Sequence, residues 1–315
     1  MFQVLNEPGS AARPFAPARQ RTLKRAVALS GIGVHTNASA RLTLHPADAN
    51  TGVMFAVRGS SQPFAAHWTN VADTTLCTAL GDASGITVHT VEHLLAACAG
   101  LGLDNVRVVI DGPELPAFDG SAAAFATAID AAELIELPEC RRVLKVLRPL
   151  RVQHGPSFAE FLPAERGLTL DIEIDFPQPV IGRQRKILNI DPGTFRHEVS
   201  RARSFGFLGD LTPLQARGLA LGASLDNTVA LLDDAVLNPE GLRFPDECVR
   251  HKMLDALGDL ALVGAPIIGV FRSYRGGHAL NISALRALLS EPSAFRCEPV
   301  RAGARSDCDI SAARP

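Results

Sequence analysis

Histidine and carboxylate side chains are spaced for joint chemistry in the apolar segment 249–263, which carries His251, Asp255 and Asp259. On a helix, residues four apart lie on one face, so His251 and Asp255 can reach one point, and Asp259 follows one turn later. The surrounding leucines predict a buried helix, in which an unpaired carboxylate is costly. We therefore expect a positive charge beside these acids. The alternative is a helix whose two acids face solvent and whose histidine has only a structural hydrogen bond.

A second candidate pair, Glu92 and His93, opens a short apolar helix predicted over 91–99. The positive end of the helix dipole favours a carboxylate at Glu92 and a neutral imidazole at His93, which is the form that binds metal. Alone, the pair is most simply a helix start. Combined with His251 and Asp255, His93 completes a set that suits a catalytic zinc with bound water, or a non-haem iron, and Glu92 could take the proton of that water.

A third histidine, His278, follows two glycines after a predicted strand. It is either a surface-loop residue or a general acid that Asp259 keeps protonated, since a nearby negative charge raises the pKa of histidine. Arg201 and Arg203 lie in the segment 200–207 and could bind phosphate, but solvent-facing side chains are the simpler interpretation. The nucleophile-elbow, Walker, dinucleotide-binding and His-Glu-x-x-His motifs are absent from the sequence.

The elements that must position these residues come as groups of strands before helices, which favours an α+β fold with mostly antiparallel sheets. In each half an apolar helix ending in glycine precedes an aliphatic strand, and this repeated pattern indicates a duplication. The segment 168–176 alternates perfectly, which places Thr169, Asp171, Glu173 and Asp175 in water and the residues between them in the core. Strands are expected at 21–29, 38–45, 52–57, 86–89, 105–111, 143–152, 158–162, 168–176 and 267–272, and helices at 91–99 with Thr90 as cap, 121–132 with Ser121 as cap, 191–200, 211–217, 246–263 and 282–290.

Length and composition set the remaining bounds. The chain has 315 residues, 47% hydrophobic and 20% charged, with a net charge of −2, which suits two globular domains and argues against a nucleic-acid partner. The apolar run 260–271 is broken by Pro266 and is too short for a membrane span. Six scattered cysteines without a Cys-x-x-Cys pair favour a reducing cytoplasm. We expect a disordered arm over 1–19, domains over 20–141 and 142–300, and a tail over 301–315.

Eight motifs, in order between residues 20 and 290, together resemble one family, the zinc-dependent UDP-3-O-acyl-N-acetylglucosamine deacetylases of lipid A synthesis. The motifs are Gly-Val-His-Thr at 33–36, Asp-Thr-Thr-Leu-Cys-Thr at 73–78, Thr-Val-Glu-His at 90–93, Asp-Gly-Ser at 119–121, Ser-Arg-Ala-Arg-Ser-Phe-Gly-Phe at 200–207, Leu-Arg-Phe at 242–244, Val-Arg-His-Lys-Met-Leu-Asp-Ala-Leu-Gly-Asp at 249–259 and Gly-His-Ala-Leu-Asn at 277–281.

The resemblance implies two similar domains, each a layered sheet with a pair of helices, whose helices face each other across the active site. It implies Zn²⁺ as cofactor, a UDP-sugar substrate that loses its N-acetyl group as acetate, and a cytoplasmic protein, which we expect to be a monomer. The roles it assigns are metal ligands for His93, His251 and Asp255, general base for Glu92, general acid for His278, orientation of that acid for Asp259, oxyanion donor for Ser204, and substrate binding for Lys252, Phe205 and Phe207.

Two positions depart from the family pattern. Ser204 stands where threonine is expected, and Ala223 stands where glycine is common, in the segment that should wall the acyl passage. We hypothesise that the extra methyl of Ala223 narrows the passage and favours a shorter acyl chain. Cys77 lies near the site by resemblance, and an inert buried thiol is the favoured interpretation. Two other functions stay open: a non-catalytic nucleotide-sugar binder with a structural metal, and a metal-dependent dehydratase.

Overall fold

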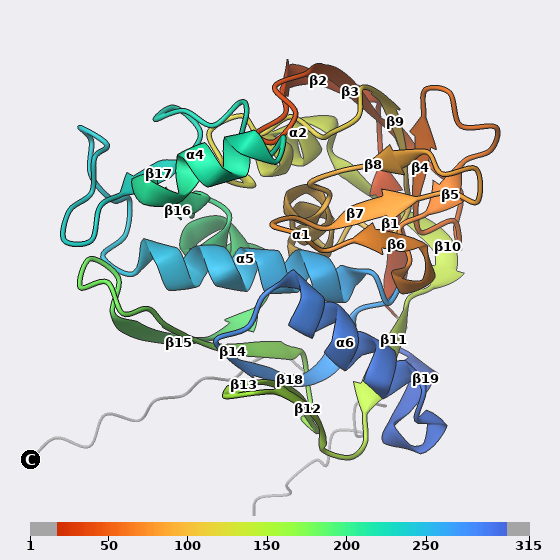
Figure 1. Ribbon diagram of the computed structural model, residues 1–315. Coiled ribbons are helices and arrows are strands. Elements are labelled where there is room, and N and C mark those ends of the chain that lie inside the picture. The colour runs from red at the N-terminus through yellow and green to blue at the C-terminus, as the bar shows by residue number, and fades with distance from the viewer. Residues whose placement is uncertain (1–17, 301–315) are drawn as a thin grey trace, which may run out of the picture.

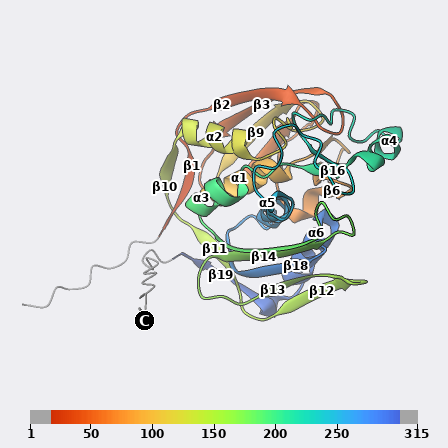
Figure 2. The ribbon, with the colours of Figure 1, turned by 90° about the vertical axis from the view of Figure 1, so that its left-hand side faces the viewer.

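The structure is a computed structural model that describes residues 18–300. Two larger sheets form outer layers, and most of the helices lie between them, as Figure 2 shows. The long helix α5 (Glu247–Ala261) crosses the middle of the molecule, and the shorter helix α1 (Glu92–Leu101) packs directly against it (Figure 1). The α+β layering with mostly antiparallel sheets, predicted from the sequence, is confirmed.

The two larger sheets share one topology. Five strands of each sheet follow the same order: the third is parallel to the fourth, and the other neighbours in that order are antiparallel. The second sheet has two further strands, one of them parallel to its central strand. The predicted duplication is therefore visible in strand order and direction. The first sheet has the order β2 (Val27–Ile32), β3 (Ser39–Pro46), β9 (Val106–Asp111), β4 (Val53–Val57), β5 (Phe64–Ala65), and the second has β12 (Leu150–His154), β13 (Ser157–Leu162), β18 (Ile267–Tyr274), β14 (Leu168–Asp175), β15 (Arg183–Ile190).

Each half contributes a pair of helices to the middle layer: α1 and α2 (Ala123–Ala132) in the first, α5 and α6 (His278–Leu289) in the second. Smaller elements complete the described chain. They are β1 (Arg19–Leu23) paired with β10 (Leu134–Cys140); the small sheet of β6 (Val71–Asp73), β7 (Ala79–Gly81) and β8 (Thr87–Val88); β11 (Arg142–Val146) beside β18, and β19 (Phe295–Pro299) beside β11; α3 (Pro192–Thr194) with a π-helical turn (Phe195–Val199); β16 (Phe205–Phe207) paired with β17 (Val229–Leu231); α4 (Leu208–Ala216); and 3₁₀ turns at Trp68–Asn70 and Pro292–Ala294.

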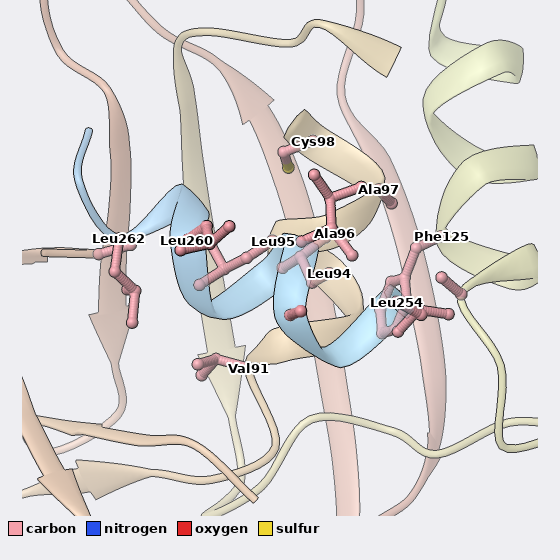
Figure 3. Packing of buried hydrophobic residues seen from close by; sticks show 14 of the residues in the cluster. Val91, Leu94, Leu95, Ala96, Ala97, Cys98, Phe125, Leu254, Leu260 and Leu262 are labelled. Carbon is pink, nitrogen blue, oxygen red and sulfur yellow. The ribbon is translucent and has the colours of Figure 1, made fainter. Parts of the chain in front are cut away.

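Helix α1 is apolar on nearly every face because it lies between the first sheet and α5. Figure 3 shows Leu94 and Leu95 of α1 packed with Leu254 and Leu260 of α5. Small residues bring the two backbones close together at the crossing. A Cβ atom built on Gly258 would lie 2.0 Å from the carbonyl oxygen of Glu92. Glycine is therefore required at this position, and the contact fixes α5 against the start of α1.

Two predicted strands are wrong in extent. The segment expected as one strand over 21–29 forms β1 and β2, with a bend at Lys24 and Arg25, and the segment 143–152 forms β11 and β12, with a break that contains Pro149. The helix expected over 191–200 is the short α3 followed by the π-helical turn. Helix α6 begins at His278, four residues earlier than predicted. The strands that the sequence does not predict are β5, β6, β7, β10, β15, β16, β17 and β19.

The caps and one exposed face were also predicted wrongly. Thr90 does not cap α1: its φ is +58° and its hydroxyl donates to Glu114. Helix α2 begins at Ala123, two residues after Ser121. Asp171 is 2% exposed, not solvated, because Arg185 and Arg272 both donate to its carboxylate. Ion pairing from neighbouring strands thus overrides the alternating pattern.

Most of the predicted arm and the whole tail lie outside the described residues, while Arg19, placed in the arm, belongs to β1. The domain boundary at 141/142 stays a prediction, and it falls between β10 and β11. Within residues 18–300, no helix has the length and apolar character needed to cross a membrane.

The α1–α5 crossing can be tested with Gly258→Ala. The added methyl has to push the Glu92 carbonyl away, so we expect the free energy of unfolding to fall by about 1–3 kcal/mol. Gly209→Ala in α4 is the matched control, because nothing lies within 4 Å of its Cβ position and alanine favours helix. Urea unfolding of both variants measures the difference, and equal stabilities would contradict the assigned role of the crossing.

Candidate active site

A cavity of about 1100 Å³ lies between the two halves and draws its walls from both. His93 of α1, His251 of α5 and His278 of α6 reach it from three helices. Apolar side chains from β16, α4 and the segment 220–230 line much of the remainder, so a polar cluster adjoins an apolar passage. A cavity of this composition suits an amphiphilic ligand with a polar head and an apolar chain.

Three donor atoms at one wall of the cavity lie close enough together that they could hold a metal ion. His93 Nε2 lies 3.7 Å and His251 Nε2 lies 3.4 Å from Asp255 Oδ1, and all three side chains are buried. Donor atoms held tetrahedrally at about 2.0–2.1 Å from a zinc ion lie roughly 3.3–3.4 Å from one another. The observed separations fit such an ion, with a fourth position left open for water or substrate.

The surroundings of this cluster prepare its members to bind a metal. The Nδ1 atom of His251 lies 3.1 Å from the carbonyl oxygen of Ala202, which accepts a hydrogen bond from it. This bond keeps the hydrogen on Nδ1 and leaves the lone pair of Nε2 free to bind a metal. Burial lowers the pKa of His251 to about 4, so the ring is neutral at pH 7. Burial opposes ionisation of Asp255, but His251 and the Lys252 ammonium, 2.8 Å from Oδ2, hold its pKa well below the usual range.

Glu92 is the buried carboxylate next to His93 at the start of α1. Its Oε2 accepts a hydrogen bond of 3.0 Å from the backbone N–H of Thr78. Burial disfavours the charged form and raises the pKa of Glu92. A carboxylate with a raised pKa is better matched to accepting and releasing a proton near neutral pH, which is the property required of a general base.

His278 and Asp259 form a buried pair on the other side of the cluster. His278 Nδ1 donates to Asp259 Oδ2 at 2.9 Å, which leaves Nε2 to face the cavity. His278 is the first residue of α6, not part of a surface loop. Burial disfavours the imidazolium, but the carboxylates of Asp259, Asp255 and Glu92 together outweigh this effect and raise the pKa of His278 to about 9. The ring is therefore protonated at pH 7 and can act as a proton donor.

The structure brings the other predicted site residues to the same cavity. The Lys252 ammonium lies 5.7 Å from the ring centre of Phe205, and the Phe205 ring lies 6.1 Å from that of His251. The Ser204 hydroxyl donates to the carbonyl oxygen of Gly120 at 3.2 Å. Among the predicted site residues, only Asp259 does not line the cavity. The residues that line the cavity are Glu92, His93, Ser204, Phe205, Phe207, Ala223, His251, Lys252, Asp255 and His278.

Sequence reasoning missed the contacts that hold this cluster in place. Arg203 does not face solvent: it is buried, 2.9 Å from Glu247, and also pairs with Glu240. Thr78 and Asn281 both donate to Asp259. Both lie in segments that carry the family resemblance, but nothing in their spacing indicates a partner so far along the chain. Cys77 is buried and burial raises the pKa of its thiol, consistent with an inert side chain.

A layered α+β chain with a buried ligand cluster, a candidate base and a paired imidazolium at the head of an apolar cavity defines a candidate hydrolytic enzyme. Residues 20–290 match the family described as LpxC, UDP-3-O-acyl N-acetylglycosamine deacetylase. Proteins named UDP-3-O-acyl-N-acetylglucosamine deacetylase from Brucella ovis, Brucella canis and Brucella suis are each 50% identical to the chain over 281 residues, covering 88% of this chain and 98% of theirs. The chain belongs to this deacetylase family.

The His278–Asp259 pair predicts a pH-dependent stability. The pKa of His278 rises from 6.5 to about 9 on folding, so the pair stabilises fully below pH 6.5 and this contribution is lost as pH rises through about 9. We expect the wild type to have a higher free energy of unfolding than His278→Gln. This difference should be largest below pH 6.5 and should shrink toward pH 9. Urea unfolding across this range measures it. Asp259→Asn should lose the same increment, and a pH-independent excess would contradict the assignment.

Proposed function

We propose that this chain hydrolyses the acetamide of UDP-3-O-acyl-N-acetylglucosamine, giving acetate and the free-amine UDP-sugar, as the committed step of lipid A synthesis. One observation is the main support for the proposal. Five side chains lie close together at the polar end of an apolar cavity: His93, His251, Asp255, Glu92 and His278. The names of the 50% identical relatives support the same substrate. Both halves of the site come from one chain, which supports the proposal that a monomer suffices.

We propose that His93, His251 and Asp255 hold a zinc ion. When bound, such an ion polarises an amide carbonyl and lowers the pKa of a water molecule from about 15.7 toward 7. The donor set supports this choice because two imidazoles and one carboxylate, with an open position, are typical of hydrolytic zinc sites. We further propose a cytoplasmic location, which the free thiols of Cys77, Cys98 and Cys248 support.

The proton transfers are assigned to residues of the chain. Glu92, whose pKa burial raises, accepts a proton from the attacking water. His278, charged at pH 7, donates its Nε2 proton to the sugar nitrogen as the bond to the acetyl carbon breaks, because an amine leaves poorly without a proton. Asp259 holds the ring through Nδ1. The Ser204 hydroxyl donates a hydrogen bond to the carbonyl oxygen of Gly120 at 3.2 Å, and it would rotate to donate to the developing oxyanion instead.

The substrate would lie along the cavity with its sugar near Lys252 and Phe205. Burial disfavours the Lys252 ammonium, but the carboxylates of Asp255, Asp259 and Glu92 together raise its pKa, so it keeps its charge. The acyl chain would then follow the apolar wall formed by Phe207, Leu211 and Ala223. This orientation places the polar head at the buried acids and the chain against apolar side chains.

The decisive experiment measures acetate release from UDP-3-O-acyl-N-acetylglucosamine by purified protein, with and without a chelator, alongside metal analysis. We expect about one zinc per chain and activity that the chelator abolishes. His251→Ala should lose the metal, because it removes one of three ligands. Glu92→Ala should keep the metal and lose roughly 10²–10⁴ in rate, as expected for a missing general base.

The outcomes separate the alternatives. Normal turnover of Glu92→Ala would refute the assignment of the base. Binding of UDP without acetate release would favour a nucleotide-sugar binder with a structural metal, and iron in place of zinc in the metal analysis would replace the proposed cofactor.

The acyl passage yields a specificity prediction. The methyl group of Ala223 lines the cavity, so Ala223→Gly should widen it and shift the preference toward longer chains. Turnover on substrates with acyl chains of ten, twelve and fourteen carbons, compared between wild type and variant, measures the shift. Ala216→Gly at the end of α4, outside the cavity lining, is the control. An unchanged order of preference would refute the role of Ala223.

A further inference from the structure

Thr78 connects the two sides of the site and has no role in the chemistry assigned above. It is fully buried immediately before β7, in the first half of the chain. Its backbone carbonyl accepts from the N–H of Val91 at 3.2 Å, and its backbone N–H donates to Glu92 at 3.0 Å. The main chain of Thr78 is thus attached to the start of α1, where the candidate base lies.

The side chain of Thr78 reaches the other half of the molecule. Its hydroxyl donates to Oδ1 of Asp259 at 2.6 Å, and it is the side chain that bonds to that oxygen in the described structure. The second oxygen, Oδ2, accepts from His278 Nδ1 and from Asn281 Nδ2, both at 2.9 Å. A fully buried carboxylate needs such donors on both oxygens. The three bonds together fix the rotation of the carboxylate and therefore the direction in which it holds the His278 ring.

We propose that Thr78 is a positioning residue for the proton donor: its hydroxyl holds the His278 ring in place through the bond to Asp259 and through its own 3.3 Å contact with His278 Nδ1. This inference rests on the proposed deacetylase function. Thr78 does not line the cavity, so it would act on the rate of the chemical step and not on substrate binding. The same residue ties the base to the acid, since its backbone holds Glu92 and its hydroxyl holds the partner of His278.

The test compares Thr78→Val, which keeps the shape and removes the hydroxyl, with Thr78→Ser, which keeps the hydroxyl and removes a methyl. Loss of a hydrogen bond to a buried charge should lower kcat of Thr78→Val about 10- to 100-fold, with KM changed by less than about twofold. Thr78→Ser should stay within about threefold of the wild type in both parameters. Metal content and urea unfolding of each variant are measured in parallel, and Thr78→Ala replaces Thr78→Val should the latter fail to fold.

A double-mutant cycle distinguishes positioning from a general structural effect. In a His278→Ala background the proton donor is absent, so adding Thr78→Val should cost less than about twofold in single-turnover rate. An equal loss in both backgrounds, or a wild-type kcat for Thr78→Val, would overturn the inference while leaving the proposed function intact. Absence of acetate release by the wild-type protein would overturn the proposed function, and this inference with it.

Discussion

The close crossing of α1 and α5 is the contact on which the site depends. Because Gly258 has no side chain, the α5 backbone can approach the carbonyl of Glu92, and the leucines on either side keep the helices there. At that separation His93, from the start of α1, comes within 3.7 Å of Asp255, from the middle of α5. A helix pair one side chain further apart would leave these donors too distant to share an ion. Backbone packing therefore sets the separation of these donor atoms.

The second constraint is electrostatic, because the crossing buries more negative than positive charge. Three carboxylates, Glu92, Asp255 and Asp259, share this space with the cations of Lys252 and His278. Two of the acids are directly paired, Asp255 with Lys252 and Asp259 with His278. Glu92 has a backbone N–H but no cation of its own, and burial raises its pKa. A metal ion beside Asp255 would offset this imbalance, and the raised pKa of Glu92 suits a group that takes up a proton.

The sequence predicts those parts of the site that depend on local spacing. The four-residue interval of His251 and Asp255 and the adjacent Glu92 and His93 place their side chains by helix geometry alone. Local patterns fail where the deciding partner is distant in the chain. Asp171 follows a strand pattern that predicts exposure, yet it is buried because Arg272, a hundred residues later, pairs with it. Arg203 and Thr78 likewise gain their roles from residues 44 and 181 positions away.

The repeated topology explains why the chemistry lies between the halves. In each half an apolar helix leads into the central strand of a sheet, α1 into β9 and α5 into β18, so pairing the halves brings equivalent helices together. Each helix brings part of the candidate site, since His93 lies on α1 and both His251 and Asp255 lie on α5. The hydrogen bond from Thr78 to Asp259 crosses the same boundary, as does the packing of Leu94 against α5. Any opening of this interface would separate His93 from Asp255 and Thr78 from Asp259 at once, so the contacts that stabilise the fold are also those that assemble the candidate site.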